Sequence, residues 1–155
     1  MNTRIISIQK GERHERMRVQ SARETQERAK HLLKELRGGD VLALSGEVGA
    51  GKTTFTQGIA LALGVKDTIT SPTFVLMKIY KLPAPLNGIA YLCHIDTYRL
   101  ESADELRALG AEEYIGRSDT LTVIEWPEKV KKLLPAKAIW ISFEHSDTVR
   151  GSVSR

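Results

Sequence analysis

The chain has 155 residues and a hydrophobic fraction of 41%, which is typical of one globular domain that buries roughly 70% of its unfolded surface. With a charged fraction of 27% and a single cysteine, the composition excludes disordered, fibrous and disulfide-scaffold proteins. The net charge of +4 is mild, and no apolar run is long enough for a membrane span or a signal peptide. We therefore expect a cytoplasmic protein without a membrane partner.

The first 18 residues are predicted to be a charged extension in front of a domain at residues 19–155. Basic residues outnumber acidic ones there: Arg4, Lys10, Arg13, Arg16 and Arg18 against Glu12 and Glu15. Such a segment could help to hold an RNA or an acidic partner. A solvated, partly mobile arm is the better supported interpretation, because chain termini are usually loose.

Apolar periodicity predicts alternating helices and strands from residue 21 onward. Ser21 and Glu24 have capping-box spacing and open a helix that ends at Gly38-Gly39 and should pack on a sheet. A short buried strand follows at residues 41–44. Next come a helix at 53–63, ended by Gly64, and a hairpin of strands 74–82 and 89–95 joined by a turn-rich connection at 83–88. A second capping box, Ser102 and Glu105, opens a short helix that ends at Gly110. The last elements are a strand at 120–124, a helix at 128–134 with Pro127 in its first turn, and a strand at 138–143. Together they predict an α/β fold, a three-layer domain with a mixed sheet that includes an antiparallel hairpin.

Residues 46–53, Gly-Glu-Val-Gly-Ala-Gly-Lys-Thr, form a phosphate-binding loop between a predicted strand and a predicted helix. Its glycines remove Cβ atoms that would block a close approach, so backbone N–H groups and the positive end of the helix can face a triphosphate. The flanking strand and helix disfavour the alternative, a glycine-rich turn without a ligand. The three-layer α/β fold is therefore predicted to be a P-loop NTPase domain. We expect ATP with Mg²⁺, Lys52 at the β- and γ-phosphates and the Thr53 hydroxyl on the metal. The predicted nucleotide-binding residues of this segment are Gly46, Glu47, Val48, Gly49, Ala50, Gly51, Lys52, Thr53 and Thr54, the last as a donor to the α-phosphate.

Hydrolysis needs a carboxylate for the metal and a group that orients water, and two acids end predicted strands. Asp96 occupies the position of a Walker-B acid, and Glu125 opens onto the same crevice if its strand is parallel to that of the loop. We predict both as catalytic residues and, with Thr53, as metal ligands; the alternative for each acid is a cap or a salt bridge. His94 precedes Asp96 by two residues, but a lone strand histidine is more often a packed core residue, and we assign it no role.

Further motifs accompany the loop: Ser71-Pro72-Thr73-Phe74, the run from His94 to Leu100, Glu105-Leu106 with Gly110, and Glu125-Trp126-Pro127. In this order they resemble the TsaE (YjeE) family of bacterial P-loop ATPases over roughly residues 19–145. The resemblance implies that Thr73 belongs to a switch-like loop and that Trp126 lies with Glu125 close to the nucleotide. It also implies a role in the N6-threonylcarbamoyladenosine modification of adenosine 37 in tRNAs that read ANN codons. In that family the ATPase acts with the TsaD and TsaB proteins, so tRNA is reached indirectly through the complex.

Three other functions compete with this interpretation. A small P-loop kinase that phosphorylates a metabolite is the chief alternative, for which Arg99, Arg107 and Arg117 are available as phosphate-binding arginines. A GTPase is disfavoured, because the chain has no Asn-Lys-x-Asp motif. A nucleotide-gated interaction module lies close to the preferred function, since slow hydrolysis and dependence on partners are what the resemblance implies.

Overall fold

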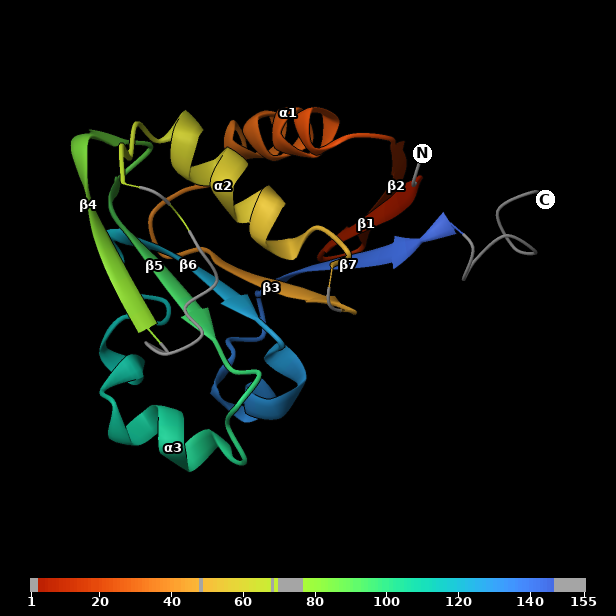
Figure 1. Ribbon diagram of the computed structural model, residues 1–155. Coiled ribbons are helices and arrows are strands. Elements are labelled where there is room, and N and C mark those ends of the chain that lie inside the picture. The colour runs from red at the N-terminus through yellow and green to blue at the C-terminus, as the bar shows by residue number, and fades with distance from the viewer. Residues whose placement is uncertain (1–2, 48, 68, 70–76, 147–155) are drawn as a thin grey trace.

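The expected elements assemble on one seven-stranded sheet, seen in a computed structural model that describes residues 3–47, 49–67, 69 and 77–146 (Figure 1). The strand order is β2-β1-β7-β3-β6-β5-β4. In chain order the elements are β1 (Arg4–Lys10), β2 (Arg13–Val19), α1 (Ala22–Leu33), β3 (Val41–Gly46), α2 (Lys52–Ala62), β4 (Met77–Leu86), β5 (Ile89–Asp96), α3 (Ala103–Ala108), η1 (Ala111–Glu113), β6 (Thr120–Glu125), η2 (Pro127–Leu133) and β7 (Ile139–His145). None of the helices in this part of the chain is long and apolar enough to cross a membrane.

The centre of the sheet is parallel and its flanks are antiparallel, which confirms the predicted mixed sheet. β3 lies between β6 and β7 and runs parallel to both, and β5 runs parallel to β6. β4 pairs with β5 as the expected antiparallel hairpin. Because parallel strands end at the same edge, the last residues of β3, β5 and β6 meet there: Glu125 is in register with both Leu44 and Asp96.

Helices cover the sheet on both faces, which confirms the three layers (Figure 1). α1 and α2 lie together on one face, where Leu33, Phe55 and Ile59 pack with Leu42 and Leu44 of β3. α3, η1 and η2 lie on the opposite face over a second, smaller apolar cluster. The site described below lies at the carboxyl ends of β3, β5 and β6, and this end of the sheet is called the site edge.

The expectation of a loose arm at residues 1–18 is wrong for the residues described there. β1 and β2 form an antiparallel hairpin, and β1 pairs along its length with β7. Ile6 and Ile8 of β1 are buried in the same core as α1 and α2, and Met17 of β2 packs against it. Most of the charged side chains are exposed, among them Arg13, Arg16 and Arg18, whereas Arg4 and Lys10 are partly buried. β2 is an edge strand of the sheet, where exposed charges are solvated.

Local signals at the helix ends had mixed outcomes. The capping box at the start of α1 forms, with Ser21 Oγ accepting from the Glu24 N–H at 3.1 Å and Glu24 Oε2 accepting from the Gln20 N–H at 2.6 Å. The second capping box is wrong, because the Ser102 side chain caps no N–H of α3. η2 has Pro127 in its first turn as predicted, but it is a 3₁₀ segment kinked at Val130 (φ −125°, ψ 26°) and not an α-helix.

The β4–β5 hairpin is longer than the sequence suggests. β4 continues to Leu86, through residues that were expected to form the connection, and the turn shortens to Asn87 and Gly88. Both turn residues have positive φ (53° and 78°), as a two-residue hairpin turn requires. The first residues of the predicted strand at 74–82 lie outside the described residues.

Candidate functional site

The phosphate-binding loop connects the end of β3 to the start of α2, as its sequence predicts. Gly46, Gly49 and Gly51 all have positive φ (144°, 78° and 111°), which side chains with a Cβ rarely adopt. A Cβ at Gly46 would also lie 2.5 Å from the Phe143 carbonyl oxygen on β7, so the start of the loop admits only glycine. A Cβ at Gly49 would meet nothing within 4 Å, so this part of the loop borders open space.

Lys52, the first residue of α2, turns its ammonium back over the loop. Its Nζ donates to the Gly46 carbonyl and, at 3.3 Å, to the Glu47 carbonyl, and it lies 3.7 Å from the centre of the Trp126 ring. The side chain is buried, and this desolvation lowers the pKa of Lys52. The carboxylates that oppose this lowering are, in decreasing order, Glu125, Glu128, Asp96 and Glu47.

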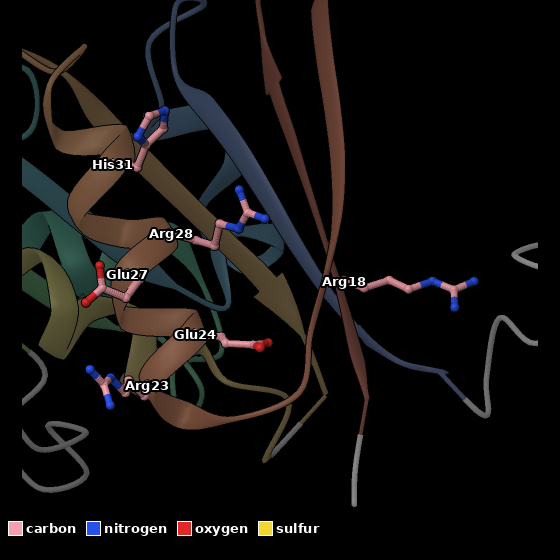
Figure 2. A pocket seen from close by; sticks show the side chains of 6 residues that line it. All are labelled: Arg18, Arg23, Glu24, Glu27, Arg28 and His31. Carbon is pink, nitrogen blue, oxygen red and sulfur yellow. The ribbon is translucent and has the colours of Figure 1, made fainter.

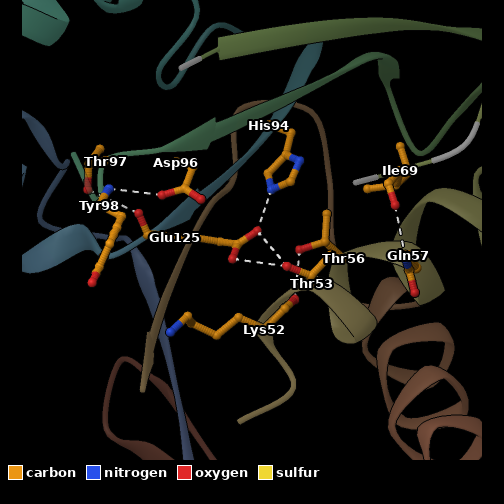
Figure 3. A network of polar contacts seen from close by, with 10 residues as sticks. All are labelled: Lys52, Thr53, Thr56, Gln57, Ile69, His94, Asp96, Thr97, Tyr98 and Glu125. Carbon is orange, nitrogen blue, oxygen red and sulfur yellow. Dashed lines mark hydrogen bonds and ion pairs between the residues drawn. The ribbon is translucent and has the colours of Figure 1, made fainter. Parts of the chain in front are cut away.

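Glu125 lies at the centre of a buried polar chain (Figure 3). The Thr53 hydroxyl donates to its carboxylate at 3.3 Å from Oε1 and 3.5 Å from Oε2, and His94 Nε2 lies 2.6 Å from Oε2. His94 and Glu125 have exposed fractions of 0% and 2%, so this contact is shielded from water. The carboxylate is therefore held from two sides, by α2 and by β5.

The sequence analysis assigned His94 no role, but in the structure His94 contacts the Glu125 carboxylate and belongs to the site. The available signal was its spacing: residues two apart on a strand share a face, so His94 had to point to the same side as Asp96. What the spacing could not reveal is the neighbour, because β6 brings Glu125 beside them only in the folded sheet. The other ring nitrogen, Nδ1, is buried and has no hydrogen-bond partner in the part of the chain that the structure describes.

The turns after β5 and β6 hold Asp96 and Trp126 in place. Asp96 has an exposed fraction of 6%, and its Oδ1 accepts from the Tyr98 N–H at 2.9 Å. The Thr97 hydroxyl donates to the carbonyls of Glu125, at 3.0 Å, and of Trp126. Trp126 adopts the left-handed conformation (φ 61°, ψ 50°), and its ring packs against that of Tyr98 with centroids 4.9 Å apart. A strained backbone that is fixed by several contacts is typical of functional sites.

Most of the predicted residues thus share one edge of the sheet, while their chemical roles stay predictions. Lys52, Thr53, Asp96, Glu125 and Trp126 are mutually close through the contacts above. Of the remaining predicted residues, Ala50 is buried, Gly51 and Thr54 are partly buried, Glu47 and Gly49 are exposed, and Val48 and Thr73 lie outside the described residues.

The donor set at this edge fits a magnesium ion that is shared with phosphate. Among the described residues, no three His, Cys, Asp or Glu side chains gather so that they could hold a metal by themselves. The Thr53 hydroxyl and the Asp96 and Glu125 carboxylates would supply only part of a coordination sphere. Mg²⁺ commonly takes one or two carboxylates and completes its shell with phosphate and water oxygens. The residues present therefore suit Mg²⁺ carried with a nucleotide better than a dedicated metal site.

Two features away from this edge carry no comparable chemistry. A pocket beside α1 mixes both signs of charge, and Arg18 of β2 extends away from the helix (Figure 2); it is lined by Arg18, Arg23, Glu24, Glu27, Arg28 and His31. Burial raises the pKa of the Cys93 thiol to about 12, so it stays protonated and is no nucleophile.

Comparison with known proteins finds relatives of this chain. The family model described as "Threonylcarbamoyl adenosine biosynthesis protein TsaE" matches residues 19–152. The tRNA threonylcarbamoyladenosine biosynthesis protein TsaE of Streptomyces coelicolor is 44% identical over 109 residues, 69% of this chain and 70% of that protein. The protein of the same name from Rickettsia bellii is 37% identical over 130 residues, 83% of this chain and 85% of that protein.

The Bacillus subtilis TsaE protein is 41% identical over 103 residues, and the match spans 66% of this chain and 60% of that protein. The crystal structure of Bacillus subtilis YdiB superposes with a TM-score of 0.63 at 29% identity, covering 92% of this chain and 77% of that one. The family match begins at residue 19, so β1 and nearly all of β2 precede it. This chain belongs to the TsaE family of threonylcarbamoyl adenosine biosynthesis proteins.

Proposed function

We propose that this protein binds ATP with Mg²⁺ at the loop of residues 46–53 and hydrolyses it slowly. The observation that carries the proposal is the convergence of Lys52 and Thr53 with Asp96 and Glu125 at the carboxyl ends of β3, β5 and β6. In open α/β sheets, ligands bind in the crevice outside these strand ends. The positive end of α2 and the Lys52 ammonium supply charge for an anion, and the acids supply oxygen ligands for its metal.

Each residue has a task that follows from its surroundings. Lys52 rests on two carbonyls and an aromatic face, and phosphate oxygens are stronger partners for its ammonium than either. Glu125 is fixed by Thr53 and His94, so its carboxylate is suited to hold an attacking water. Asp96 faces the same crevice. When bound, Mg²⁺ would polarise the phosphate oxygens and neutralise developing charge.

Membership of the TsaE family supports a pathway in which the proposed hydrolysis takes place. We propose that it supports the N6-threonylcarbamoyladenosine modification of adenosine 37 in tRNAs that read ANN codons. The protein would act with TsaD and TsaB in the cytoplasm, with tRNA reached through the complex. The Streptomyces and Rickettsia relatives are named tRNA threonylcarbamoyladenosine biosynthesis proteins, which supports this pathway.

The rival function, a metabolite kinase, finds little support in its candidate arginines. Arg107 pairs with Asp104 at 3.0 Å and also with Glu112, and Arg117 pairs with Asp119 at 2.9 Å. These pairs occupy the guanidinium groups that a phosphoryl acceptor site would use. Arg99 also takes part in an interaction of its own.

The decisive test is a reconstitution with TsaD and TsaB, ATP, Mg²⁺ and unmodified tRNA, followed by mass spectrometry of the modified nucleoside. We expect Lys52→Ala to abolish ATP-dependent modification, whereas Lys66→Ala, an exposed lysine beyond α2, leaves it unchanged. Full turnover with Lys52→Ala would refute the proposal. A parallel pull-down with TsaD and TsaB, with and without ATP, tests the partnership, and transfer of labelled phosphate to a metabolite instead of water would favour the kinase.

A further inference from the structure

The N-terminal hairpin brings a cation to the phosphate-binding loop. β1 runs antiparallel to β7, with Arg4 opposite His145, and β7 runs parallel to β3, with Phe143 opposite Gly46. The first residue of β1 therefore lies at the same sheet edge as the end of β3. This strand precedes the part of the chain that the TsaE family model matches, so membership of the family assigns it no role.

The side chain of Arg4 points toward α2. Alternation along β1 places it on the face of Ile6 and Ile8, which pack in the core beneath α1 and α2. A Cβ built on Gly51 would lie 3.8 Å from Arg4 Cδ and 3.6 Å from the Phe143 ring. The aliphatic stem of Arg4 thus runs beside Gly51, the residue that precedes the first turn of α2.

One N–H group of the Arg4 guanidinium lacks a hydrogen-bond acceptor among the described residues. Its Nε is buried and finds no hydrogen-bond partner among the residues that the structure describes, although Arg4 as a whole is only partly buried. A buried donor without a partner is destabilising, and more so when the group is charged. An anionic partner at the loop would relieve this penalty.

The side from which Arg4 approaches indicates which part of a nucleotide it meets. Asp96 and Glu125 lie on β5 and β6, on one side of β3, whereas Arg4 comes from β1 and β7 on the other side. In the proposed ATP site, the acids and Thr53 hold the end of the triphosphate that carries the metal. A nucleotide that lies across the strand ends with its metal at this position extends its nucleoside end toward β7 and β1.

We propose that Arg4 contacts the nucleoside monophosphate half of the bound nucleotide, a contact that rests on the proposed ATP site. A guanidinium suits this position, because it can pair with a phosphate and stack on a purine. The hairpin then has two tasks: it completes the core with its apolar face, and it extends the nucleotide site with its first residue.

The test measures the Kd of the full-length protein for ATP and for ADP by calorimetry in Mg²⁺ buffer. Arg4→Met keeps the stem beside Gly51 and removes the charge, and it should weaken ATP and ADP by the same factor, about tenfold. Arg4→Lys should show a smaller loss, about threefold, since it keeps the charge but not the planar fork. Arg16→Met, an exposed residue of β2 in the same hairpin, should leave both Kd values unchanged.

The outcomes separate this inference from the proposed function. If Arg4→Met binds ATP and ADP like the wild type, or loses affinity for ATP alone, Arg4 does not contact the nucleoside monophosphate half and the inference is wrong. If the wild type binds neither nucleotide, the proposed function itself fails. Thermal melting accompanies each titration, and if Arg4→Met is unfolded at the assay temperature, an unchanged Kd in Arg4→Lys overturns the inference.

Discussion

The central parallel strands and the N-terminal hairpin use burial for different purposes. At the carboxyl ends of β5 and β6, His94, Asp96 and Glu125 are buried although each is polar, and each is held by specific partners. In the hairpin, the fully buried positions are apolar, such as Ile6 and Ile8, and the charged side chains of β2 face solvent. The comparison teaches where changes should affect chemistry and where they should affect stability.

The largest effect is expected at the carboxyl ends of the central parallel strands. Glu125→Gln keeps the shape of the side chain but removes the charge that would hold a water, and ATP hydrolysis should fall by about 10²–10⁴-fold. ATP affinity should change far less, because Lys52 and the loop remain. Phosphate release and calorimetry measure the two quantities, with Glu27→Gln, an exposed acid of α1, as the control. A wild-type rate in Glu125→Gln would remove this residue from the chemistry.

The next effect tests whether the hairpin belongs to the core. Ile6 is fully buried, and Ile6→Ala should lower the free energy of unfolding by about 2–5 kcal/mol. Gln9→Ala, at an exposed position of the same strand, should change it by less than about 0.5 kcal/mol. Urea denaturation of both variants gives the comparison. Equal stabilities would mean that β1 does not pack as described.

The smallest effect concerns the partner of Glu125. His94→Ala leaves one oxygen of a buried carboxylate without its contact, which should lower the free energy of unfolding by about 1.5–3 kcal/mol and also slow hydrolysis. His94→Gln can donate a hydrogen bond again and should recover part of the hydrolysis rate at unchanged ATP affinity. If Glu125 needs no positioning, the two variants will hydrolyse ATP equally fast.

The same contrast explains what the sequence could predict. The central strands are continuous apolar runs, such as residues 41–44, and the glycine-rich loop directly follows one of them. Both the strands and the phosphate-binding loop could therefore be predicted from the sequence. Asp96 and Glu125 were found because each ends such a run. Capping of α1 was equally local, since Ser21 and Glu24 lie within one turn.

The hairpin was missed because its signal is not local. β1 is a short mixture of apolar and polar residues and β2 is mostly charged, and pairing with β7, which is distant in the sequence, places Ile6 and Ile8 in the core. His94 was set aside for a similar reason, because its partner Glu125 belongs to another strand. Ser102 has capping-box spacing with Glu105, yet it caps no N–H, which shows that spacing alone does not make a cap.

An open sheet of seven strands leaves two edges with unpaired backbone groups, and such edges can recruit further strands from other molecules. Here β4 forms one edge and carries Pro83 and Pro85, which have no N–H to offer. β2 forms the other and carries exposed charged side chains, among them Arg16 and Arg18, which disfavour the addition of an apolar strand. Both borders of the described sheet therefore carry features that disfavour the addition of a further strand.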